Sequence, residues 1–189
     1  MSKNTELKAI TSEYAKDFRI ICEKSKEERI KLLQPGDPMP RAGVLYGDDA
    51  RERFKARAAE HRTKALSIVD GELAKLNDKM TAAPSTDAVN TLMLLKMRNK
   101  ITPEDLRPIM ERYGDNNQVY DTLRDIAAQH NIRDYAFETN PLRAQAEKLN
   151  GLKSSLNNNL RIDRAEKGYA NDGFMSFLDA VIDDALPDA

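Results

Sequence analysis

Apolar residues recur in steps of three and four along most of the chain, which is the pattern of amphipathic α-helices. The clearest run covers residues 49–82 and contains no proline, with apolar or small residues at Phe54, Ala58, His61, Ala65, Ile68, Val69, Leu73, Leu76 and Met80. A helix of this length would be roughly 50 Å long, more than the width of a compact domain of this size. It therefore needs other long helices to cover its apolar face.

Three further segments predict such partners. Residues 5–33 repeat the helical pattern, and the segment that begins at Asn140-Pro141 has a face formed by Leu142, Ala146, Leu149, Leu152, Leu156 and Leu160. We expect this second segment to pack antiparallel to the central helix. After a break at residues 168–173, a final amphipathic helix places one apolar face at Phe174, Phe177, Leu178, Val181, Ile182 and Leu186.

Residues 34–48 contain three prolines and three glycines, which exclude a continuous helix. The segment is nevertheless too apolar for a simple flexible linker. We expect it either to fold back over the core or to contact a partner through Met39, Arg41, Leu45 and Tyr46.

Three short helices are predicted between residues 84 and 132, because capping signals delimit them. Ser85 to Asp87 can cap the first helix, and Thr102-Pro103 begins the second. Gly114 ends the second helix, and Asp115 or Asn116 starts the third. In the first of these helices we expect the inward residues to be Val89, Leu92, Met93 and Met97.

The predicted fold class is therefore all-α. Long antiparallel helices form a bundle or a coiled-coil-like stalk, joined by a small three-helix subdomain and a C-terminal amphipathic helix. We expect a long helical hairpin at residues 1–83, the three-helix subdomain at 84–132, and a return helix with the C-terminal helix at 133–189. The last segment should form one compact unit with the first.

The composition argues against several classes of function but does not identify one. The net charge of −1 supplies no global field that would attract nucleic acid or an anionic membrane, so either contact would need a local patch. One cysteine, Cys22, and two histidines argue against a zinc site, and we expect no metal or cofactor. We also expect no membrane span and no signal peptide, because no apolar run approaches the roughly 20 residues that a span requires.

The most basic stretch covers residues 51–64. Its cations flank the apolar face on both sides, an arrangement that is typical of side chains covering a seam with their charges in water. The alternative is a phosphate-binding surface, for which the candidates are Arg51, Lys55, Arg62 and Arg133. His61 lies on the apolar face itself and is interpreted as a hydrogen-bonded core residue. We find no catalytic motif and expect no enzyme.

Part of the three-helix region resembles a known class. Ile101-Thr-Pro-Glu-Asp-Leu, Tyr113-Gly-Asp-Asn, Tyr120 and Asp125-Ile-Ala are similar to a segment of helical proteins that bacteriophages and prophages encode among head and morphogenesis genes. The resemblance implies a phage-associated, non-enzymatic protein in the host cytoplasm or the virion. It implies no functional residue.

Two functions follow as hypotheses. The first is a structural or interaction protein that acts in particle assembly, by self-association, or by binding a host or viral protein. Its candidate partner-binding residues are Met39, Arg41, Leu45, Tyr46, Phe174, Phe177, Leu178, Val181 and Ile182. The alternative is a nucleic-acid- or nucleotide-binding module that uses residues 51–64 with Arg41 and Arg133.

Overall fold

The structure is a computed structural model that describes residues 2–132 and 140–187. Every regular element in those two ranges is helical, which confirms the all-α prediction. The elements in chain order are α1 (Lys3–Lys31), α2 (Asp48–Thr81), α3 (Thr86–Lys96), α4 (Pro103–Tyr113), α5 (Asn117–Gln129), α6 (Pro141–Asn159), α7 (Ile162–Arg164), the π-helix η2 (Ala165–Tyr169) and α8 (Asp172–Ala185). None of the described helices is both long and apolar enough to cross a membrane.

The chain forms two compact units, which we describe separately. Unit 1 comprises residues 1–71 and 149–189, and unit 2 comprises residues 72–148. The boundaries fall inside α2 and α6. Residues 48–71 of α2 and 149–159 of α6 therefore belong to unit 1, and the remaining turns of both helices belong to unit 2.

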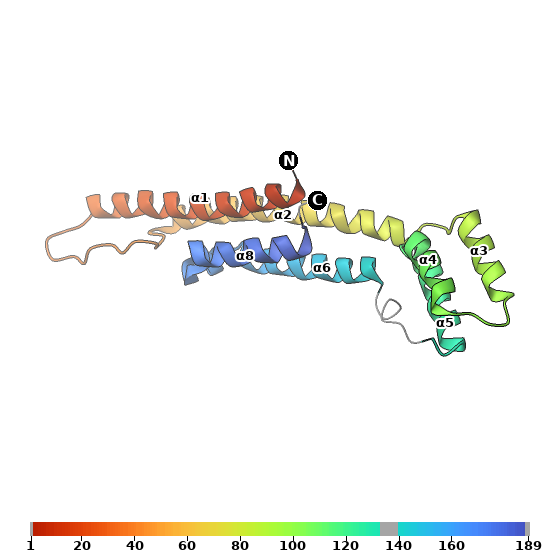
Figure 1. Cartoon of the computed structure of the whole chain (residues 1–189). Coiled ribbons are helices and arrows are strands. Elements are labelled where there is room, and N and C mark those ends of the chain that lie inside the picture. The colour runs from red at the N-terminus through yellow and green to blue at the C-terminus, as the bar shows by residue number, and fades with distance from the viewer. Residues whose placement is uncertain (1, 133–139, 188–189) are drawn as a thin grey trace. The chain divides into compact units, whose positions relative to one another are not determined.

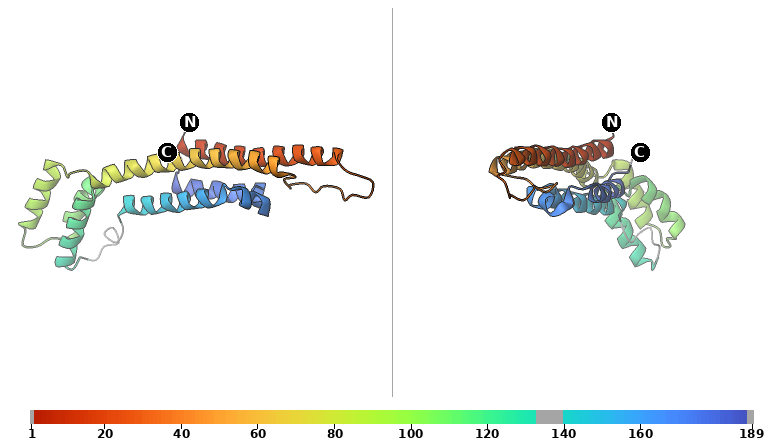
Figure 2. Two further views of the ribbon diagram at one scale, coloured as in Figure 1. Left: turned by 180° about the vertical axis from the view of Figure 1, so that it is seen from behind. Right: turned by 90° about the vertical axis from the view of Figure 1, so that its left-hand side faces the viewer.

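Long antiparallel helices build unit 1, as the periodicity predicts. α1 and α2 pack together and run in opposite directions, while α8 and the unit 1 part of α6 lie along them (Figures 1 and 2). Phe54 is fully buried at their centre, with its ring centroid 5.4 Å from that of Tyr14 and 5.0 Å from that of Phe18. The other fully buried large side chains of this core include Leu7, Leu149, Leu152, Leu156, Leu160, Leu178 and Ile182.

A polar cluster lies within this apolar core. His61 is buried, and its Nε2 lies 2.9 Å from Oδ2 of Asp17, while its ring meets Tyr14 edge-on. The hydroxyl of Tyr14 donates a hydrogen bond of 2.8 Å to the carbonyl of Arg161, and burial raises the pKa of that hydroxyl. His61 is therefore a hydrogen-bonded core residue, as its place on the apolar face indicates.

Asp183 of α8 forms hydrogen bonds with the N-terminal part of α1. Its carboxylate accepts hydrogen bonds from Lys8 Nζ at 2.6 Å and from Asn4 Nδ2 at 2.8 Å. The same Asn4 amide donates to the carbonyl of Leu186 at 2.8 Å. These bonds join the first turns of α1 to the last turn of α8.

Asp183 should make unit 1 sensitive to acid. The hydrogen bond from Lys8 and the bond from Asn4 lower the pKa of Asp183. A carboxyl whose pKa is lower in the folded state stabilises the fold above its ordinary pKa of about 4, and this stabilisation is lost as the pH falls through the folded-state pKa. In urea denaturation we expect Asp183→Asn to lose less stability than the wild type between about pH 6 and about pH 3. Asp179→Asn, the same substitution elsewhere on α8, is measured alongside, and the change in pH dependence should be larger for Asp183→Asn.

Unit 2 contains the expected three-helix subdomain. Its core collects Ala88, Leu92 and Leu95 from α3, Leu106 from α4, and Val119, Leu123, Ile126 and Ala127 from α5, with Ile101 from the preceding loop. The sequence prediction for α3 was right for Leu92 and wrong for Val89, Met93 and Met97, which are exposed. Because α3 has apolar residues on all sides, its periodicity does not identify the inward face.

Side-chain caps fix the helix starts of unit 2. The Ser85 hydroxyl accepts the backbone N–H three residues later at 3.1 Å. The Asp105 carboxylate accepts from the backbone N–H and the hydroxyl of Thr102, at 3.0 and 2.9 Å. The side-chain oxygens of Asn116 and Asn140 accept the first free N–H groups of α5 and α6. Each cap satisfies donors that the helix itself leaves unpaired.

Gly114 ends α4 at a position with no room for a side chain. A Cβ atom there would lie 2.4 Å from the backbone oxygen of Met110 and 2.6 Å from its sulfur. We expect Gly114→Ala to lower the free energy of unfolding of unit 2 by about 1 to 3 kcal/mol, because the backbone must shift. Gly151→Ala is the matched control: nothing lies within 4 Å of a Cβ atom there. That substitution should stabilise α6 by up to about 1 kcal/mol, and a loss of the same sign and size at both glycines would contradict this account.

Candidate protein-interaction face

The loop between α1 and α2 packs on α1, so it is part of the fold. Leu45 is buried, and the backbone N–H of Tyr46 donates to the Ser25 hydroxyl at 3.2 Å. The Tyr46 hydroxyl in turn accepts the backbone N–H of Arg41 at 2.6 Å. Met39 and Arg41 are the exposed members of the predicted set, and Tyr46 is half-buried. The loop thus presents Met39 and Arg41 to solvent, whereas Leu45 serves the core.

The predicted partner residues of α8 point in different directions. Leu178 and Ile182 are fully buried in the core of unit 1, so they stabilise the fold and are not available to a partner. Val181 and Phe174 are half-buried. Phe177 is 56% exposed and lies 5.8 Å from the ring of Phe174. Of the five candidates, Phe177 is therefore the exposed one, and Phe174 and Val181 are partly accessible.

The candidate phosphate-binding cations already have partners or lie apart. Arg51 pairs with Glu166 at 3.1 Å, and Lys55 pairs with Glu52 at 3.2 Å. Arg62 is half-buried on α2, and Arg133 lies outside the described residues. Two of these four side chains thus form surface ion pairs with carboxylates, and a phosphate would have to compete with those carboxylates for them.

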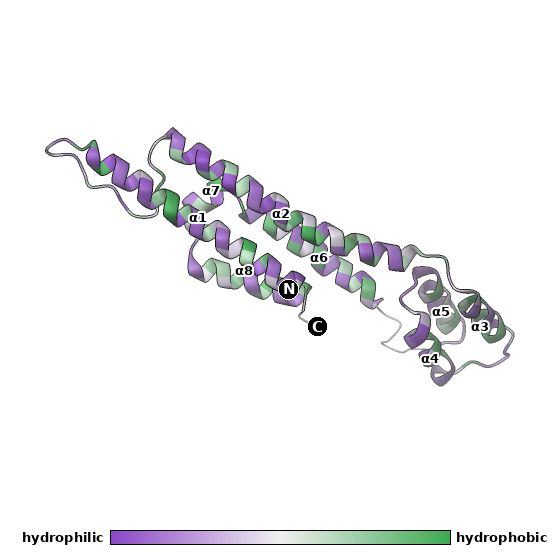
Figure 3. Ribbon diagram, turned by 90° about the horizontal axis from the view of Figure 1, so that it is seen from above, coloured by the Kyte–Doolittle hydropathy of each residue, from purple (hydrophilic) through white to green (hydrophobic). Residues whose placement is uncertain are grey.

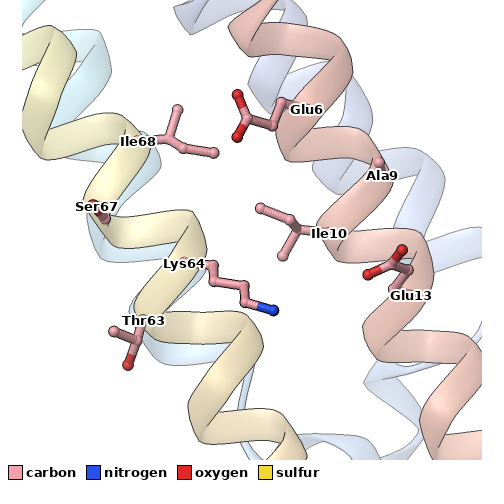
Figure 4. A pocket seen from close by; sticks show the side chains of 8 residues that line it. All are labelled: Glu6, Ala9, Ile10, Glu13, Thr63, Lys64, Ser67 and Ile68. Atoms are coloured by element: carbon pink, nitrogen blue, oxygen red, sulfur yellow. The ribbon is translucent and has the colours of Figure 1, made fainter.

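A groove of about 550 Å³ runs between α1 and α2. Ile10 and Ile68 lie in it, and Glu6, Glu13 and Lys64 lie at its edges (Figure 4). Lys64 donates to Glu60 of its own helix at 2.8 Å. We interpret the groove as the crease between two packed helices, since Glu6 pairs with Lys3 and Lys64 pairs with Glu60, each within its own helix.

The thiol of Cys22 is buried. Burial, with Glu166 and Glu23 nearby, raises the pKa of the Cys22 thiol to about 11, so the thiol stays protonated at neutral pH. Within residues 2–132 and 140–187, no group of three or more His, Cys, Asp or Glu side chains is arranged to hold a metal ion.

The exposed side of α3 is different. Ten large apolar side chains are exposed among the described residues, and four of them lie within nine residues of α3 and its C-cap. We call these four the α3 outer face: Val89 (40% exposed), Met93 (62%), Leu94 (66%) and Met97 (79%). Figure 3 shows the hydrophobic colouring of this helix. In soluble proteins, contiguous exposed apolar side chains are enriched at interaction sites, so this face is the candidate surface.

The α3 outer face lies opposite the core contacts of the same helix. Ala88, Leu92 and Leu95 point into unit 2, and at 100° per residue Met93, Leu94 and Met97 fall on the far side. A helix that is apolar all round is normally buried all round. By contrast, the exposed residues of α5 are mostly polar or charged: Gln118, Arg124, Asp125, Ala128 and Gln129. The apolar exterior is therefore a property of α3 within this subdomain.

The two ends of α3 differ in charge. Asp87 lies in the first turn and pairs with Arg112 at 3.0 Å and with the hydroxyl of Tyr113. Lys96 lies in the last turn, and Lys100 follows the helix. The α3 outer face is thus bounded by an acidic end and a basic end.

No protein-family model, curated protein or solved structure matches this chain. The similarity to phage head and morphogenesis proteins stays a prediction, and the α3 outer face has to be interpreted from its own chemistry. Sequence reasoning missed this face because it assigned Met93 and Met97 to the core. The available signal was the run from Leu92 to Leu95, four consecutive large apolar residues that cannot all face one side of a helix.

Proposed function

We propose that this chain is a non-enzymatic helical interaction protein that binds another protein through the α3 outer face. The exposure of Met93, Leu94 and Met97 on one helix carries this proposal. Removing apolar surface from water contributes about 25 cal/mol per Å², so covering these side chains favours association. Methionine also suits a binding surface, because its unbranched side chain adapts to the shape of a partner.

Particle assembly, or binding to a host or viral protein, is the setting that the phage resemblance implies for such a surface. We include it in the proposal on that ground alone. Nucleic-acid binding is the less favoured function, because Arg51 and Lys55 already pair with carboxylates. A groove that follows a phosphate backbone needs several cations directed at it.

Site-specific photo-crosslinking tests this proposal. A benzoylphenylalanine side chain is placed at position 93 of the full chain, in the cells that naturally produce the protein, and adducts are identified by mass spectrometry. The control places the same group at position 124, an exposed position on α5. We expect protein adducts from position 93 and few from position 124. Absence of adducts at position 93, or equal labelling at both positions, would overturn the proposal.

A further inference from the structure

We propose that the partner of the α3 outer face is a second copy of this chain, and that the two α3 helices pair antiparallel with Met93 at the two-fold axis. This inference rests on the proposed function. It adds the identity of the partner and the register of the contact.

The spacing of the exposed side chains suits a two-fold contact. Val89, Met93 and Met97 follow one another at intervals of four residues, so Val89 and Met97 lie about 6 Å before and after Met93 along the helix. In a two-fold contact, residue i of one copy touches residue j of the other, and j touches i. An antiparallel pair therefore places Met93 against Met93 of the copy, and Val89 against Met97 in both directions.

Charge selects the antiparallel direction. The acidic end of each α3, at Asp87, would lie beside the basic end of the copy, where Lys96 and Lys100 are found. Arg112 and the Tyr113 hydroxyl both contact Oδ2 of Asp87, and 62% of the Asp87 side chain stays exposed, so Oδ1 is the atom that would meet a lysine of the copy. Antiparallel helix dipoles also place opposite partial charges together. A parallel pair would bring Lys96 against Lys96 of the copy.

The small area of the α3 outer face limits the affinity of the proposed dimer. One helix face is smaller than the roughly 800 Å² per partner of a standard stable interface. The dimer should therefore be reversible and depend on protein concentration. Exposed methionines fit such a contact, because they can repack when the partner leaves.

Sedimentation velocity on the full chain, from about 1 to about 500 µM, measures the self-association. We expect the wild type to shift from monomer to dimer across this range. Met93→Glu and Met93→Lys should each raise the dimer dissociation constant at least about tenfold, because like charges meet at the axis. An equimolar mixture of the two variants should recover the dimer as a heterodimer. Arg124→Glu on α5 is the control and should leave the dissociation constant unchanged.

A second pair of substitutions tests the direction. Val89→Lys alone should weaken the dimer at least about tenfold, because it places a lysine beside Lys96 and Lys100 of the copy. The double variant Val89→Lys with Met97→Glu should restore it, because Lys and Glu face each other only when the helices are antiparallel. Circular dichroism checks folding, and we expect little change at these exposed positions. Failure of both rescues would overturn the proposed register.

The two proposals fail in different ways. A wild type that stays monomeric throughout the range overturns the second-copy inference, as does a dimer that is unaffected by the Met93 variants. If position 93 then crosslinks to a different protein, the proposed function is supported and only the identity of the partner is wrong. If position 93 gives no adduct and the chain stays monomeric, both proposals are overturned.

Discussion

Phe54→Ala is expected to lower the free energy of unfolding by about 3 to 5 kcal/mol. The ring is fully buried and packs on Tyr14 and Phe18, so its removal deletes apolar contacts and leaves a cavity between α1 and α2. Urea denaturation followed by circular dichroism measures the loss. Hydrogen–deuterium exchange should place it in unit 1, where the amides of α1 and α2 would lose protection.

The matched control is Phe177→Ala, which deletes the same side chain from an exposed position on α8. We expect its cost to stay within about 1 kcal/mol. Equal losses for the two phenylalanines would contradict the assignment of Phe54 to the core and of Phe177 to the surface.

Leu95→Ala should cost about 2 to 5 kcal/mol and act on unit 2. Leu95 is buried with Leu92 and Leu106 in the three-helix core, so truncation leaves a void there. Its neighbour Leu94 lies about 100° around α3 from Leu95 and is 66% exposed, so Leu94→Ala should change stability by about 0.5 kcal/mol or less. Both changes remove the same atoms from adjacent residues, and urea denaturation with hydrogen exchange compares them directly.

This pair also separates folding from binding. Leu94→Ala should weaken association through the α3 outer face while the subdomain stays folded. A large loss of stability at Leu94 would show that α3 is rotated relative to its assigned position, and the α3 outer face would then need to be redefined.

The sequence predicts the helical architecture because the relevant signals are local. The intervals of three and four residues specify the faces of α1, α2 and α6, and the caps at Ser85 and Asn116 specify where short helices begin. These features depend on neighbours within one or two turns, which a single sequence displays in full.

The candidate surface could not be predicted in the same way, because a pattern shows which residues are apolar and not what covers them. On α8, the apolar face predicts a partner surface, but Leu178 and Ile182 are covered by other helices of unit 1. On α3, the opposite error occurred, and exposed methionines were assigned to a core. In both cases the deciding contacts come from segments far away in the sequence.

For the basic stretch at residues 51–64, the sequence likewise does not show which acidic residues pair with its cations. Arg51 pairs with Glu166, more than a hundred residues later in the chain. A helical wheel identifies the side of α2 on which a cation lies, but the acid that neutralises it becomes visible only in the folded structure.

The split of unit 1 between residues 1–71 and 149–189 affects the order in which the protein folds during synthesis. Residues 72–148 of unit 2 are continuous, so α3, α4 and α5 can form their core as soon as they leave the ribosome. In unit 1, α1 and α2 can pack on each other around Phe54, but the rest of their apolar surface stays uncovered until Leu156 and Ile182 are translated. We therefore expect residues 1–71 to be the segment that needs protection by chaperones, because the nascent chain exposes apolar surface there until α6 and α8 are made.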